Sequence, residues 1–212
     1  SAKTGSIVVN SASGQSNSLP FTVRSGRIFF VDINSPSDPG SGTFTDPWRS
    51  PKSFYDSATA GDTVYIRAGT YSGTYGYPNG SANLMMRHGT GSGYTAAGTQ
   101  VQPIAWLGYP GETALFSAPG PTGNTANVRG WLGSSTDKAP DWYVFGNLSF
   151  LAYNGCVSAG GTNSAAHGWR IVGNECEGLT RTSQLQTGTI VPGGNYSKVL
   201  GNTIHGGRTG DK

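Results

Sequence analysis

Apolar residues recur in a fixed pattern over the second half of the chain. The phrase at residues 142–147 (WYVFGN) returns at 169–174 and again at 197–202, and its Gly-Asn pairs lie 27 and then 28 residues apart. These units are rich in Val, Ile, Thr and Gly and lack the apolar runs of 3.6-residue period that a helical repeat needs. A fixed period in this range is typical of solenoids, whose units bury their apolar faces against one another. The pattern predicts strands that stack coil upon coil.

The Gly-Asn pairs predict the corners between strands, because Gly accepts a positive φ without steric cost and Asn tolerates it better than most residues. We expect the stacked Asn side chains to hydrogen-bond to one another. When the units are aligned on these pairs, two columns are expected to point inward: Val144, Ile171 and Val199 before the corner, and Ser149, Cys176 and Ile204 after it.

Shorter patterns predict the elements of the first half. Residues 27–33 and 63–67 have the composition of strands, and Ser50 followed by Pro51 predicts an N-cap and a first helical position, opening a short helix to about Ser57. Two long insertions, 72–100 and 118–141, interrupt the coils. Long loops on a rigid scaffold commonly carry binding functions.

Composition narrows the class of protein. The 212 residues include 34 Gly, and only 12% are charged, against about 25% in an ordinary domain. The net charge of +3, without a basic cluster interleaved with aromatic residues, argues against nucleic acid as a partner. No stretch approaches the ~18 apolar residues of a membrane span. Low charge and many small polar residues favour a secreted or bacterial cell-surface protein.

The two cysteines, Cys156 and Cys176, follow their Gly-Asn corners at different spacings. They therefore do not fall in one stacked column. We expect buried free thiols here rather than a disulfide.

The first half resembles a known fold family. Val31-Asp32, the GSGT loop at 40–43, Pro47-Trp48, the short helix and the run AGDTVYIRAGTY at 60–71 resemble the start of right-handed parallel β-helix proteins of the pectate-lyase-like superfamily, and PIAWLGYPGE at 103–112 is similar to the next rung. The resemblance covers residues 27–212. It implies an all-β, right-handed parallel β-helix (solenoid) whose open N-terminal end is capped by the helix.

Residues 1–24 have the pattern of two strands and a turn, too short to bury a core alone. They resemble the closing hairpin of an IPT/TIG immunoglobulin-like domain, and the alternative is a leader hairpin of the solenoid. We therefore expect two domains, 1–24 as the C-terminal remnant of an IPT/TIG-like domain and 25–212 as the N-terminal part of a β-helix. No cap follows His205, so we expect further coils, a second fragment or another subunit to cover the last coil.

The resemblance implies a carbohydrate-active protein, above all a polysaccharide lyase acting on a uronate polymer. Its β-elimination needs a cation to neutralise the carboxylate, a base for the C5 proton and an acid for the leaving oxygen. The alignment places Tyr143, Arg170 and Lys198 in one column, and His205 beside Glu177 in another. Lys198 or His205 is the expected base, completed by Tyr143 or an arginine. The alternatives are a solvated basic face and an ordinary Glu–His cross-strand pair.

Further residues are expected to hold an acidic polysaccharide. Arginines would hold carboxylates bidentately, and loop tyrosines would either stack on sugar rings or simply fill their loops; these are Arg181, Arg208, Tyr75, Tyr77 and Tyr94. Asn174, Glu175 and Glu177 are similar to the Glu-x-Glu calcium ligands of an alginate and chondroitin lyase family within the superfamily, which implies Ca²⁺, although the residues that follow depart from that family.

Two other functions compete with the lyase. One is a non-catalytic glycan-binding or cell-surface module, which needs only aromatic rings and hydrogen bonds. The other is a β-helix glycoside hydrolase, which needs two carboxylates roughly 5–10 Å apart across a groove.

Overall fold

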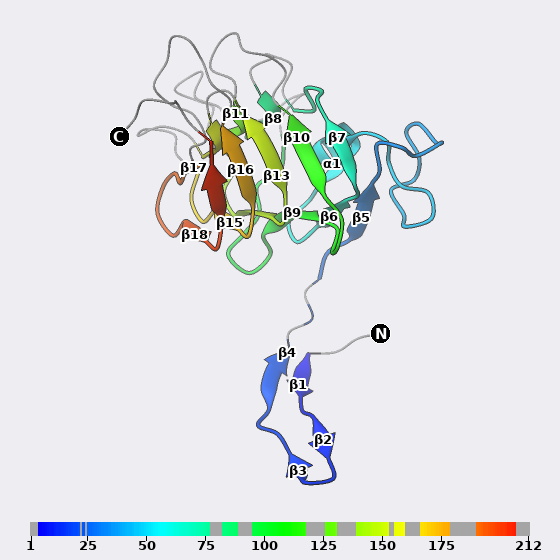
Figure 1. Ribbon diagram of the computed structural model, residues 1–212, viewed down its shortest axis with the longest axis vertical. Helices are drawn as coiled ribbons and strands as arrows, with labels where there is room; N and C mark the ends of the chain where they lie inside the picture. The colour runs from blue at the N-terminus through cyan, green and yellow to red at the C-terminus, as the bar shows by residue number, and fades with distance from the viewer. Residues whose placement is uncertain are drawn as a thin grey trace.

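The chain forms a parallel β-helix, as its repeats predict (Figure 1). The computed structural model describes residues 4–21, 23, 25–76, 82–88, 95–117, 126–130, 139–152, 155–159, 166–178 and 190–206. From β6 (Thr63–Ile66) to β17 (Ile190–Val191) the chain passes through three sheets in turn, and every strand pair within these sheets is parallel.

Sheet 1 has six strands. In order from the last coil to the first coil, they are β18 (Lys198–Leu200), β15 (Arg170–Val172), β12 (Tyr143–Gly146), β9 (Ile104–Gly108), β6 (Thr63–Ile66) and β5 (Ile28–Val31). Sheet 2 has five strands, β19 (Thr203–His205), β16 (Glu175–Gly178), β13 (Ser149–Ala152), β10 (Ala114–Ser117) and β7 (Gly69–Tyr71). Sheet 3 has four strands, β17 (Ile190–Val191), β14 (Gly155–Ser158), β11 (Ala126–Gly130) and β8 (Ala82–Met86).

A helix covers the first coil. Helix α1 (Pro51–Ser57) has Ser50 as its N-cap, whose side chain accepts a hydrogen bond from the backbone N–H of Lys52, as the Ser-Pro pair predicts. Phe54 and Tyr55 of this helix are buried, and the Phe54 ring packs edge-on against Trp106 of sheet 1 at 4.9 Å. The helix therefore closes the apolar interior at this end.

The corners repeat with a register one residue away from the expected one. Asn147, Gly173 and Gly201 share the left-handed backbone, with φ of 53°, 63° and 61°. Strand pairing agrees, because Gly146 pairs with Val172 and Ser149 pairs with Glu175. The Asn of the first unit thus takes the place of the Gly in the next two.

This shift corrects both expected columns. Phe145, not Val144, lies inward with Ile171 and Val199, and Phe150, not Ser149, lies inward with Cys176 and Ile204. Phe145 and Phe150 are buried, whereas Val144 and Ser149 are half-buried. The expected Asn stacking is confirmed for one pair, in which Asn174 Nδ2 donates to Asn202 Oδ1 at 2.9 Å. Asn147 instead donates to the Gly108 carbonyl at 3.2 Å.

A second asparagine pair lies inside the solenoid, between sheets 2 and 3. Asn127 Nδ2 donates to Asn83 Oδ1 at 2.9 Å and to the carbonyls of Phe116 and Leu151, and both side chains are fully buried. The register of β11 against β14 puts Cys156 next in this column.

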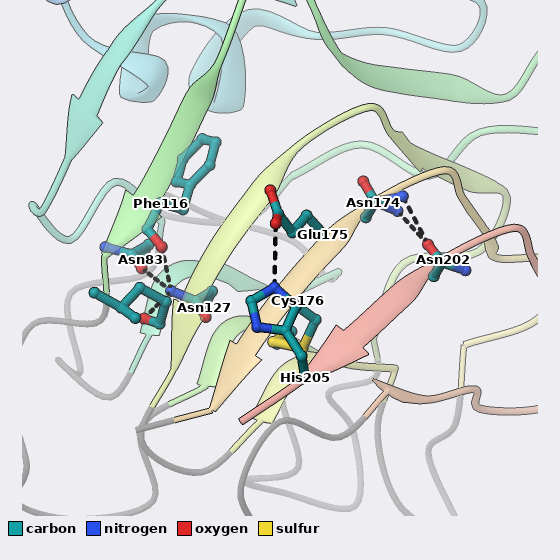
Figure 2. Close-up of a disulfide and its surroundings, with 10 residues drawn as sticks. Asn83, Phe116, Asn127, Asn174, Glu175, Cys176, Asn202 and His205 are labelled. Atoms are coloured by element: carbon teal, nitrogen blue, oxygen red, sulfur yellow. Dashed lines mark hydrogen bonds and ion pairs between the residues drawn. A yellow bond between two sulfur atoms is a disulfide. The ribbon is translucent and has the colours of Figure 1, made fainter. Parts of the chain in front are cut away.

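The expectation of free thiols is wrong. Cys156 of sheet 3 forms a disulfide with Cys176 of sheet 2 in the following coil, with 6.0 Å between their Cα atoms (Figure 2). The two residues belong to different columns, as expected, but both point into the interior, and the bond crosses it. A comparison of columns alone does not show whether two side chains in different columns point toward each other.

The N-terminal hairpin stands apart from the solenoid (Figure 1). Strand β1 (Gly5–Ile7) pairs antiparallel with β4 (Leu19–Phe21), and β2 (Asn10–Ser11) pairs with β3 (Gly14–Gln15). Its described side chains are all exposed. The assignment of residues 1–24 to an IPT/TIG-like domain and of 25–212 to the β-helix domain stays a prediction.

In the last coil the inward columns end at Val199 and Ile204, which are 40% and 51% exposed. The expectation that another segment or subunit covers this coil also stays a prediction. Among the described residues, no helix is long and apolar enough to cross a membrane.

Candidate functional site

The structure places the candidate residues on two different outer faces. Arg170 and Lys198 lie on sheet 1, whereas Glu175, Glu177 and His205 lie on sheet 2. A corner at Gly173 and Gly201 separates the two sheets. The basic and acidic candidates therefore belong to separate surfaces.

The cations of sheet 1 form an adjacent pair. Arg170 pairs directly with Lys198, and Arg170 in turn pairs with Val144 rather than with Tyr143. In the described part of the chain neither cation has an ion-pair partner. Arg170 is half-buried and Lys198 is exposed. Neighbouring strands of a sheet are about 4.8 Å apart. Two cations that lie opposite each other on such strands form a surface that favours anions.

A groove of about 410 Å³ runs from Arg170 along the outer face of sheet 1. The floor of the groove is one column of outward-facing residues that ends at Arg170. In the coils before Arg170 this column holds small or apolar side chains, which are Ile28, Thr63, Ala105 and Val144. Arg27 lies at the far end, where its guanidinium forms a 2.6 Å ion pair with the buried Asp62. Arg27 thus lies at the opposite end of the groove from Arg170, with its charge compensated by Asp62. The sequence pattern placed Arg27 in the first strand but did not mark it for the site, because it lies outside the repeats.

Tyr143 does not take part in this surface. Its side chain is fully buried, its hydroxyl lies 2.9 Å from Thr95 Oγ1 and it donates to the Ala96 carbonyl at 2.8 Å. Burial raises the pKa of this hydroxyl well above its usual range. The expectation that Tyr143 shares a column with Arg170 and Lys198 is wrong, because the one-residue shift turns it inward.

On sheet 2, His205 contacts a different carboxylate from the one expected. Glu177 lies opposite His205, but His205 Nε2 lies 3.1 Å from Glu175 Oε1, the diagonal neighbour (Figure 2). The other oxygen of Glu175 accepts a 3.4 Å hydrogen bond from Ser149. In the preceding coil the column of Glu177 and His205 holds Leu151, which pairs with Glu177.

This arrangement limits the chemistry of sheet 2. The carboxylate lies between the serine and the imidazole, so His205 is not placed to take a proton from Ser149. A groove of about 330 Å³ runs over the neighbouring corner and is lined by two carboxylates, Glu112 and Glu175. Glu112 forms a 2.7 Å ion pair with Arg67, so Glu175 is the carboxylate of this groove that would repel the carboxylates of a uronate polymer.

Asn174 does not fit the expected calcium site. It is buried, its Oδ1 accepts from the backbone N–H of Leu148 at 3.0 Å, and its Nδ2 donates to Asn202 Oδ1 and to the Phe145 carbonyl. Glu175 and Glu177 remain exposed on one face. Two carboxylates supply fewer oxygens than the six to eight that Ca²⁺ takes, so these residues alone do not form a calcium site.

Of the expected substrate-binding residues, only Tyr75 falls in the described part of the chain. Tyr75 packs against Tyr71 and the core, and burial raises the pKa of its hydroxyl. Its loop-filling role, one of the two alternatives, therefore has structural support. Tyr77, Tyr94, Arg181 and Arg208 lie outside the described residues.

Comparisons with known proteins give one structural likeness. Neither a protein-family model nor a curated protein sequence matches the chain. A solved structure described as a rhamnogalacturonan lyase is similar, with 20% sequence identity and a TM-score of 0.40. The match covers 72% of this chain and 35% of that one, so this chain spans about a third of its length.

Proposed function

We propose that this chain belongs to a secreted or cell-surface carbohydrate-active protein that binds an acidic polysaccharide on the outer face of sheet 1. The observation that carries the proposal is the directly paired Arg170 and Lys198, which have no ion-pair partner among the described residues. Arg170 of this pair lines one end of a groove. Such a pair supplies the positive charge that uronate carboxylates require.

The proposed reaction is β-elimination. Arg170 neutralises the uronate carboxylate and thereby acidifies the C5 proton. The neighbouring Lys198 removes this proton as general base when its amine is uncharged, and becomes an ammonium. The electron pair of the C5–H bond forms the C4–C5 double bond. The C4–O bond breaks with its electron pair on the leaving oxygen, which takes a proton from solvent water. This assignment retains two of the four expected catalytic residues and omits Tyr143 and His205, which lie elsewhere.

A non-catalytic glycan-binding module is the second candidate. It is favoured by one observation: among the described residues that line the groove beside Arg170, none carries a carboxyl or a tyrosine hydroxyl that would protonate the leaving oxygen. A binding module needs no such acid.

The test combines binding with product detection. The chain is incubated with alginate, polygalacturonate, chondroitin and glucuronan, and the ultraviolet absorbance of the unsaturated product is followed, while binding is measured by affinity electrophoresis. We expect retention on at least one polymer together with a rise in absorbance, both lost in Arg170→Gln and Lys198→Gln. The matched control is Lys52→Gln, which removes one positive charge from helix α1.

The outcomes separate the candidates. Retention without absorbance selects the binding module, and new reducing ends without absorbance select a hydrolase. Equal retention of Arg170→Gln, Lys198→Gln and the Lys52→Gln control contradicts the assignment of sheet 1 as the binding face.

A further inference from the structure

An aromatic pair lies at the corner that leads into the cationic strands. Trp142, Gly168 and Tyr196 occupy equivalent positions in three successive coils, each two residues before its outward residue in sheet 1. For Gly168 and Tyr196 those outward residues are Arg170 and Lys198. At about 3.3 Å per residue of extended chain, the Cα atoms of the aromatic column lie at most ~7 Å from those of the cations.

All three corner residues have left-handed backbone. The φ angles are 59° for Trp142, 67° for Gly168 and 65° for Tyr196. Glycine suits this conformation, as Gly168 shows, whereas bulky residues seldom adopt it. Two large aromatic residues are therefore held where the backbone alone favours glycine. Residues kept in such conformations cluster at ligand-binding sites.

The two rings stack on one another across the middle coil. Their centroids lie 6.1 Å apart with an angle of 21° between the planes. Gly168 makes this possible, because a side chain there would overlap the Trp142 ring. Tyr196 is 75% exposed and Trp142 is half-buried. The rings thus do not serve to fill the core.

A histidine is fixed beside this pair. The backbone N–H of His167 donates to Asp141 Oδ1 at 2.8 Å, and the backbone N–H of Asn195 donates to His167 Nδ1 at 3.0 Å. Because Nδ1 accepts, the proton of the neutral ring resides on Nε2. His167 is exposed, so this N–H is a donor suited to a sugar hydroxyl.

We propose that Trp142 and Tyr196 form a stacking platform for one sugar ring of the acidic polysaccharide. Aromatic faces bind the apolar C–H face of a pyranose, and the adjacent Arg170 and Lys198 hold the carboxylate of the same or the next residue. This inference rests on the proposed function and adds to it the position and orientation of the sugar ring.

The test measures binding of uronate oligosaccharides and of their carboxyl-reduced, neutral counterparts by titration calorimetry. Tyr196→Gly removes the ring and relaxes the backbone, so we expect an affinity about tenfold weaker together with a thermal midpoint that is unchanged or higher. Tyr196→Phe keeps the ring and retains most of the affinity. The matched control is Asn147→Gly, which relaxes a left-handed residue at the opposite end of strand β12 and leaves the affinity unchanged.

Each outcome bears on a different statement. Full affinity in both Tyr196→Gly and Trp142→Gly, with affinity lost in Arg170→Gln, overturns the platform and leaves the proposed function standing. Binding of the neutral oligosaccharide that depends on Tyr196 but not on Arg170 supports the platform and overturns the acidic substrate. Absence of binding by the unaltered chain to either ligand overturns both.

Discussion

Cys156 and Cys176 are joined across the interior, from sheet 3 of one coil to sheet 2 of the next. In the preceding coils the same two positions hold a buried asparagine and an aromatic ring, Asn127 and Phe150. The disulfide therefore replaces a pair of noncovalent coil-to-coil contacts, a hydrogen-bond ladder and a ring column, with one covalent contact.

The first prediction concerns this bond. Its cysteines are 20 residues apart, and closing a loop of that size stabilises a fold by roughly 3 kcal/mol. We expect Cys156→Ala with Cys176→Ala to lower the free energy of unfolding by about that amount, measured by guanidinium denaturation. Reductant should have a similar effect on the unaltered chain and none on the double variant. Equal midpoints with and without reductant, once thiol titration shows full reduction, would contradict a stabilising role.

The second prediction follows from the end of the inner asparagine column. Asn127 Oδ1 is buried and has no hydrogen-bond partner among the described residues, and Cys156 is its next neighbour in the column. An asparagine there would donate to Asn127 Oδ1 as Asn127 donates to Asn83. We expect the free energy of unfolding of the Cys156→Asn, Cys176→Ala double variant to be about 1 kcal/mol higher than that of the double alanine variant. A lower value would show that the column cannot be extended at this position.

The third prediction tests the corrected register. Gly173 has a φ of 63°, and a Cβ added there would meet no atom within 4 Å, so Gly173→Ala acts through the backbone alone. We expect a loss of about 1–2 kcal/mol in the free energy of unfolding. Asn147→Gly, at the equivalent corner, should cause no comparable loss. If Asn147→Gly destabilises as strongly as Gly173→Ala, the equivalence of these two corners is wrong.

The fourth prediction concerns pH. Burial tends to raise the pKa of Asp62, but hydrogen bonds from the Arg27 side chain and from the backbone N–H groups of Arg27 and Thr59 bring it below its ordinary value. A lowered pKa in the folded state means that the stabilisation is complete above the pKa of the unfolded carboxyl, near 4, and is lost as pH falls through the folded value.

We therefore expect Asp62→Asn to lower the free energy of unfolding by roughly 1–3 kcal/mol at neutral pH. The difference from the unaltered chain should narrow as the pH falls below about 4. Urea denaturation at several pH values measures both. Asp56→Asn is the control, since its ion pair with Lys52 is half exposed on both sides and contributes little. A difference that widens toward acid pH would contradict the assignment.

Local signals were sufficient for the capping helix and the period of the coils. Ser50 and Pro51 specify a helix start through contacts within one turn, and the recurring Gly-Asn pairs specify corners. Local signals were not sufficient to predict the register of the strands, because both Gly and Asn accept left-handed backbone. Asn147 could therefore stand where Gly173 and Gly201 stand, and the sequence alignment matched it to Asn174 instead.

That one-residue shift explains most differences at the candidate site. In a strand it exchanges the inner and outer faces, which moves Tyr143 into the core and places Val144 beside Arg170. The disulfide and the Trp142–Tyr196 pair involve contacts between corners or sheets that no periodic pattern contains. One signal was nevertheless present: once the register is shifted, two aromatic residues align with Gly168.

The fifth prediction uses the charge of the proposed binding face. Arg170 and Lys198 are directly opposite on neighbouring strands, and like charges in such positions are destabilising. Lys198→Glu replaces this repulsion with attraction, so we expect the free energy of unfolding to rise by up to ~1 kcal/mol at low ionic strength and the gain to shrink as salt screens it. The same change should abolish retention on acidic polysaccharides, because it adds a carboxylate to the site. Lys198→Gln, which only removes the charge, should have a free energy of unfolding between those of the unaltered chain and Lys198→Glu, and should also lose retention. If Lys198→Glu lowers both the free energy of unfolding and the retention, Lys198 supports the fold of the last coil rather than a binding site.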